Sequence, residues 1–175
     1  DSGYKTEYEI IFQRANDLYF TNALRKHFPQ DSKKLEFLPQ NVSLKDGYKI
    51  LPRANINFHE LFSCCTAERV PRHAEIGASL LFTPKENLSK EDKLAVAFDG
   101  FILGNIQARF PSHGKVIYGR NFKVKRIEIE TKFNRVRSII SEIRKFSLTE
   151  DASPKIILNR HCQVCEFKES CKAIA

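Results

Sequence analysis

Residues 78–83 read ASLLFT, an apolar run that is followed directly by Pro84. A short apolar run with a proline at its end is typical of a strand buried in the middle of a sheet. A few residues later, Ser89-Lys90-Glu91-Asp92 predicts a helix start, with Ser89 as the cap and Asp92 near the positive end of the helix dipole. The helix should continue to about Arg109 and bury one apolar face: Leu94, Ala97, Phe98, Phe101, Ile102 and Ile106.

Further elements are predicted on both sides of this strand and helix. Turns at Asp46-Gly47 and at residues 119–121 should join neighbouring strands into hairpins. The order of elements predicts the α/β class, with a mixed sheet built from a meander and a helical crossover. Hydrophobic spacing predicts amphipathic helices at residues 4–28 and 133–146, and strands at residues 42–44, 48–51, 55–58, 116–119 and 122–129.

The length of 175 residues is that of one domain, which divides into an N-terminal helix (1–30), an α/β core (31–150) and a cysteine-rich tail (151–175). Apolar residues make up 42% of the chain, enough for one core. No apolar stretch approaches the ~20 residues of a membrane span, and no basic-then-apolar leader opens the sequence. We therefore expect a cytoplasmic protein without membrane contact. Because the sequence starts at Asp1 rather than at methionine, we also expect a fragment of a larger chain.

The chain is basic, and its excess charge lies towards the C-terminus. The formal net charge is +8, and residues 113–175 hold 14 Lys and Arg against seven Asp and Glu, a net +7. A basic face of this kind suits DNA, because each neutralised phosphate releases counterions; a plain solvated surface is the alternative. The candidate contacts with DNA are Lys123, Lys125, Arg126, Arg135 and Arg137.

The five cysteines are clustered. Cys64 and Cys65 are adjacent, and Cys162, Cys165 and Cys171 form a C-x2-C-x5-C pattern. An odd, clustered number without a secretory signal argues against a disulfide framework. Thiolates at this spacing favour zinc or an iron–sulfur cluster, both of which need a fourth ligand. Cys64, Cys65 or His161 could supply it.

The order of elements, together with the cysteine tail, resembles the RecB-like branch of the PD-(D/E)XK nuclease superfamily. The nearest likeness is to uncharacterised bacterial RecB-like nucleases and to CRISPR-associated RecB-type nucleases. The resemblance is carried by residues 78–83, 92–103, 106–107, 114–119 and 158–167. It implies a restriction-endonuclease-like mixed sheet flanked by helices.

The resemblance also implies that a 4Fe–4S cluster, rather than zinc, joins the tail to an upstream cysteine. Cys162, Cys165 and Cys171 match the family residue by residue. The family's upstream cysteine is missing, since no cysteine precedes Cys64. We take Cys65 as the metal ligand in its place, with Cys64, His161 or a segment outside this sequence as alternatives.

The family's catalytic carboxylates are not found at the expected positions. These nucleases place an Asp on one strand and D/E-x-K on the next, which together hold Mg²⁺ or Mn²⁺. The strand at 78–83 offers Leu81-Phe82-Thr83 or Thr83-Pro84-Lys85, and the earlier position near residues 63–66 reads SCCT. We interpret Asp99, on the predicted helix, as a solvated acid, which could be a metal ligand only if it faced the edge of the sheet. The catalytic residues are therefore unknown, with Glu75, Lys85, Glu86 and Gln107 as polar candidates, besides Glu68.

Three functions remain open from the sequence. The first is a RecB-like nuclease-family domain that acts on or binds DNA through a degenerate active site and is inactive alone. The second is a non-catalytic nucleic-acid-binding or docking module of a larger repair, transposon or defence protein. The third is a structural domain stapled by zinc.

Overall fold

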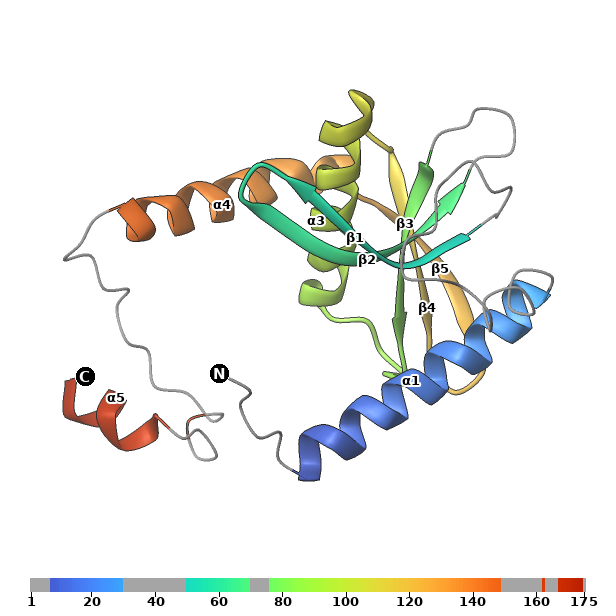
Figure 1. Ribbon diagram of the computed structural model, residues 1–175, viewed down its shortest axis with the longest axis horizontal. Helices are drawn as coiled ribbons and strands as arrows, with labels where there is room; N and C mark the ends of the chain where they lie inside the picture. The colour runs from blue at the N-terminus through green and yellow to red at the C-terminus, as the bar shows by residue number, and fades with distance from the viewer. Residues whose placement is uncertain (1–6, 30–49, 70–75, 149–161, 163–166, 175) are drawn as a thin grey trace. The chain divides into compact units, whose positions relative to one another are not determined.

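The computed structural model describes residues 7–29, 50–69, 76–148, 162 and 167–174 (Figure 1). The chain divides into two compact units, Asp1–Val136 and Arg137–Ala175. The elements, in order, are α1 (Glu7–His27), β1 (Ile50–Phe58), β2 (Leu61–Arg69), β3 (Ile76–Thr83), α3 (Lys90–Gln107), β4 (His113–Tyr118), β5 (Lys123–Glu128), the 3-10 turn η2 (Glu130–Lys132), α4 (Phe133–Leu148) and α5 (Lys168–Ile174).

The first unit is built on a five-stranded mixed sheet with the strand order β1-β2-β3-β4-β5. Strands β1, β2 and β3 form an antiparallel meander, β3 and β4 are parallel, and β5 returns antiparallel to β4. Because parallel neighbours need a crossover, α3 connects β3 to β4. The predicted α/β class, the meander and the helical crossover are confirmed.

The start of α3 is fixed as the sequence predicts. The Ser89 hydroxyl accepts a hydrogen bond from the Asp92 backbone N–H at 3.1 Å, and the Asp92 carboxylate accepts one from the Ser89 N–H at 2.8 Å. This reciprocal capping box satisfies two backbone donors that a helix start leaves unpaired. The helix ends at Ala108, in the left-handed conformation with φ 54°. Ile106, in the last turn, is 48% exposed rather than buried.

Helix α3 packs closely on one face of the sheet. The Ser79 hydroxyl of β3 donates to the backbone carbonyl of Val96 at 2.9 Å. A Cβ added at Gly114 of β4 would lie 2.2 Å from Val96 Cγ1 and 2.8 Å from Ser79 Oγ. Glycine at 114 therefore allows the helix to approach the sheet this closely.

Helix α1 covers the opposite face of the sheet. Leu24 and Phe20 of α1 pack against Leu80 and Phe82 of β3. Since side chains alternate along a strand, Leu80 and Ser79 point to opposite faces, and the first unit has a helix on each side (Figure 1). Three bonds tie α1 to the carbonyls of the β4–β5 turn: Tyr19 Oη to Gly119 at 3.0 Å, Lys26 Nζ to Asn121 at 2.9 Å, and His27 Nε2 to Phe122 at 2.7 Å.

Helix α4 begins in the first unit, where Phe133 and Val136 are buried and Phe133 packs on Phe101 and Phe110. The second unit contains the rest of α4 and the short helix α5. The hairpin turn predicted at residues 46–47 lies outside the described residues. No helix that the structure describes is long and apolar enough to cross a membrane.

Candidate functional site

The end of β3 carries no carboxylate where the resemblance would place the acid of D/E-x-K. Leu81 is half-buried and Thr83 is buried. Lys85 follows, and its Nζ donates to Asp92 Oδ1 at 2.8 Å. Burial alone would raise the pKa of Asp92, but hydrogen bonds from Lys85 and Ser89 outweigh it and hold that pKa below its usual range. Lys85 is thus engaged with the start of α3.

The other polar candidates do not gather around Lys85. Gln107 is the last residue of α3, an 18-residue helix about 27 Å long, whereas Lys85 lies before its first turn. Glu86 accepts a hydrogen bond from the Arg120 backbone N–H at 3.0 Å, which joins the loop before α3 to the β4–β5 turn. Glu75 lies outside the described residues. Lys85 and Gln107 therefore cannot share one catalytic site.

Asp99 of α3 is buried, so its interpretation as a solvated acid is wrong. The side chain is only 8% exposed, and the Ser63 hydroxyl of β2 donates to Asp99 Oδ1 at 2.5 Å. Burial raises the pKa of Asp99 to about 6, and the hydrogen bond from Ser63 opposes the rise. A signal existed in the sequence, because Asp99 lies three residues after Val96 and four before Leu103, on the buried stripe of α3.

A pocket of about 270 Å³ adjoins Ser63 on the β1–β2 hairpin. A divalent cation needs several oxygen ligands, and Asp99 supplies one carboxylate. Within the described ranges, no three His, Cys, Asp or Glu side chains are grouped so that they could hold a metal ion. Among the residues that the structure describes, the buried Asp99 carboxylate therefore lacks the further ligands that a metal ion needs. The pocket is lined by Asn55, Ile56, Asn57, Phe62, Ser63 and Cys64.

The chain matches no family model, no curated protein and no solved structure.

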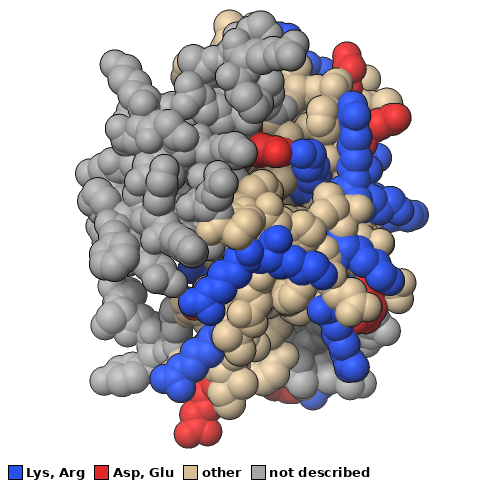
Figure 2. Space-filling model, turned by 90° about the vertical axis from the view of Figure 1, so that its right-hand side faces the viewer, with Lys and Arg blue, Asp and Glu red and all other residues tan. Residues whose placement is uncertain are grey.

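The predicted DNA contacts lie on several elements. Figure 2 shows many Lys and Arg side chains, with few Asp and Glu among them, on the described part of one side of the molecule. Lys123, Lys125 and Arg126 are exposed on β5, at the edge of the described sheet. Arg135 is exposed on the first turn of α4, and Arg137 belongs to the second unit.

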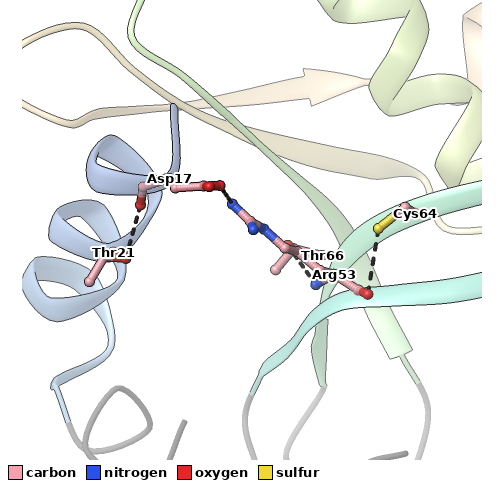
Figure 3. Close-up of polar contacts among 5 residues, drawn as sticks. All are labelled: Asp17, Thr21, Arg53, Cys64 and Thr66. Carbon is pink, nitrogen blue, oxygen red and sulfur yellow. Dashed lines mark hydrogen bonds and ion pairs between the residues drawn. The ribbon is translucent and has the colours of Figure 1, made fainter. Parts of the chain in front are cut away.

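The two adjacent cysteines of β2 have different surroundings. Cys64 is exposed, and its thiol donates to the Arg53 carbonyl at 3.5 Å (Figure 3). Figure 3 also shows Arg53 reaching from β1 to Asp17 of α1. Cys65 is 2% exposed in a cluster with Ala67 and Leu103. Burial, then the charges of Asp99 and Cys64, raise the pKa of Cys65 to about 12, so its thiol is protonated at neutral pH.

The tail cysteines belong to the second unit. Cys171 is half-buried in α5, where its backbone N–H donates to the Phe167 carbonyl at 2.9 Å. Cys162 is also half-buried, and Cys165 lies outside the described residues. Cys65, the ligand inferred from the sequence, belongs to the first unit. Each part of the predicted metal site is therefore placed only within its own unit.

Proposed function

We propose that the chain is a DNA-binding domain with a RecB-like nuclease fold whose own active site is degenerate. The observation that carries this proposal is the exposed Arg126 of β5, in register with Lys115 of β4 and flanked by the exposed Lys123 and Lys125. The order of strands and helices in the first unit is the order on which the resemblance rests, and it supports the restriction-endonuclease-like fold.

Strand β3 (Ile76–Thr83) contains no carboxylate. A metal-activated water needs a cation held by carboxylates in an open site. By the resemblance, Leu81 or Thr83 stands where the acid of D/E-x-K would be, and the earlier position near residues 63–66 reads SCCT. Lys85, which follows, is paired with Asp92. Binding of phosphate needs only cations, so it can persist without this chemistry.

Cations on an edge strand also have a purely structural use, because they discourage two edges from pairing. A DNA-binding surface and a protected edge make different predictions. Only the first predicts an affinity for DNA that falls steeply with salt, by a slope of about 0.9 per phosphate contact in log units.

We expect the purified chain to bind duplex DNA in a salt-dependent manner and to leave it intact with manganese. Fluorescence anisotropy with a labelled duplex, repeated over a range of salt concentrations, measures the slope. The triple variant Lys123→Gln, Lys125→Gln, Arg126→Gln should lower the slope by at least about 0.9, one phosphate contact. A slope near zero for the wild type would refute DNA binding, and cleavage that co-purifies with the chain would refute the degenerate site.

We also propose that Cys162, Cys165 and Cys171 hold a 4Fe–4S cluster. The support is their C-x2-C-x5-C spacing, which is typical of thiolates that bind one metal centre, and the position of Cys171 in α5. When bound, the cluster would hold the three cysteines of the C-terminal tail together.

Protein purified without oxygen should therefore be brown and contain iron and sulfide, because thiolate-bound iron absorbs visible light. Cys165→Ser should abolish the colour, and Cys64→Ser and Cys65→Ser, tested separately, should show whether either supplies the fourth ligand. Colourless protein that contains one equivalent of zinc would show that these cysteines bind zinc instead of the cluster. Protein with neither metal would refute the site.

A further inference from the structure

A row of basic side chains crosses β4 and β5 on the face of the sheet that α1 covers in part. Lys115 of β4 lies in register with Leu80 of β3 on one side and with Arg126 of β5 on the other. Side chains of paired residues point to the same face. Leu80 packs against Leu24 of α1, so Lys115 and Arg126 also lie on the α1 face.

Two like charges directly opposite one another on neighbouring strands destabilise a sheet. Glu68 of β2 relieves part of this cost, because its carboxylate forms an ion pair with Lys115. The pair is within reach of solvent, with exposed side-chain fractions of 32% for Lys115 and 26% for Glu68. Arg126 is exposed and forms no ion pair inside the part of the chain that the structure describes.

The pKa of His113 indicates whether the electrostatic potential beside Lys115 is positive or negative. His113 lies two residues before Lys115 on the same strand, and therefore on the same face. Burial lowers the pKa of His113, the charges of Arg126 and Lys115 lower it further, and Glu68 raises it only in part. The field at this place is thus positive although Glu68 is present.

We infer that a backbone phosphate of the bound DNA occupies the α1 face of the sheet between Lys115 and Arg126, and replaces Glu68 as the partner of Lys115. This inference rests on the proposed DNA binding and assigns a place to it. Side chains opposite one another on paired strands have Cβ atoms about 5 Å apart, so two long cationic side chains can reach one phosphate.

The other two cations of β5 point away from this site. In the β4–β5 register, Lys123 is paired with Tyr118, and Lys125 is paired with Val116. Since Val116 follows Lys115 directly, it and Lys125 lie on the α3 face. Lys123 and Lys125 then protect the exposed edge of the sheet. Lys115 and Arg126 thus bind the phosphate, whereas Lys123 and Lys125, with the same total charge, do not.

The test compares two double variants of the full chain, Lys115→Gln with Arg126→Gln, and Lys123→Gln with Lys125→Gln. Each removes two positive charges. In anisotropy titrations with a labelled duplex, the first pair should lower the salt slope by about 0.9, one phosphate contact, and the second should leave it close to that of the wild type. An equal or larger loss from Lys123→Gln with Lys125→Gln would overturn the inference while DNA binding itself stands. A wild-type slope near zero would instead remove the proposed function.

A gain of affinity cannot be explained by poor folding, so Glu68→Gln provides the second measurement. The substitution releases Lys115 for phosphate, and the affinity for DNA should rise several-fold at low salt. Glu7→Gln, in the first turn of α1, changes the net charge equally and serves as the control. The same rise for both variants, or no rise for Glu68→Gln, would contradict the exchange of Glu68 for phosphate.

Discussion

Asp99→Asn should raise the free energy of unfolding at pH 7 by about 3 kcal/mol. Burial raises the pKa of Asp99 from its usual 3.8 to about 6, a difference of about two pH units, and each unit corresponds to about 1.4 kcal/mol. Asparagine has nearly the same shape and can still accept the hydrogen bond from the Ser63 hydroxyl. The substitution thus removes the buried charge and keeps its contact.

The sign of the pH dependence follows from the direction of this shift. Between pH 3.8 and about 6 the folded chain binds more protons at Asp99 than the unfolded chain does. The wild type should therefore lose stability as the pH rises through this range, whereas Asp99→Asn should lack that loss. Urea unfolding at pH 4 and pH 7 measures the difference between the two proteins.

Asp92 provides a matched control in the same helix, because its pKa is lowered rather than raised. Asp92→Asn weakens the ion pair with Lys85 and the cap at Ser89. It should destabilise the fold at pH 7 by about 1 kcal/mol, the usual cost of a lost cap. If both asparagine variants shifted stability in the same direction, the assigned environment of Asp99 would be wrong.

Gly114→Ala should destabilise the fold by about 1–3 kcal/mol, the usual cost of overpacking a core. The new Cβ would lie 2.2 Å from Val96 Cγ1, a distance that no relaxed contact allows. Val96 cannot turn aside, because a β-branched side chain in a helix has essentially one preferred rotamer. The helix must move away from the sheet, which also strains the hydrogen bond from Ser79 to the Val96 carbonyl.

Gly100→Ala is the control for this effect. Its Cβ would meet the end of the Ile129 side chain at 2.3 Å, and that methyl group can shift more easily than the branched Val96. Alanine also favours a helix over glycine by about 1 kcal/mol, which offsets part of the cost. Thermal unfolding should place Gly114→Ala well below Gly100→Ala, and equal melting temperatures would refute the close approach of α3 at Gly114.

Local signals were sufficient for several elements. The apolar run before Pro84 predicts β3, and Ser89 with Asp92 predicts the start of α3, because each depends on neighbouring residues alone. Strand β2 was not predicted from its own pattern. Its residues 63–67, SCCTA, are small and have no strong alternation, and they become a strand through pairing with β1 and β3. Sheet pairing of this kind depends on long-range contacts.

The candidate site was less predictable for the same reason. The sequence predicted the cap between Ser89 and Asp92, but it did not predict that Lys85 would form an ion pair with Asp92. The row on the α1 face joins Glu68, Lys115 and Arg126 from three strands. Net charge indicated a basic C-terminal part, but only the strand register separates Arg126 from Lys125.

The attachment of α1 has a consequence during synthesis of the chain. Tyr19, Lys26 and His27 bond to carbonyls at residues 119–122, about a hundred residues further along. At a translation rate of about 5–20 residues per second, this helix leaves the ribosome some 5–20 s before its docking turn exists. During the first part of that interval, until residue 83 is made, the apolar side chains of Phe20 and Leu24 have no β3 to cover them. The nascent chain is thus exposed to chaperones and to aggregation at α1.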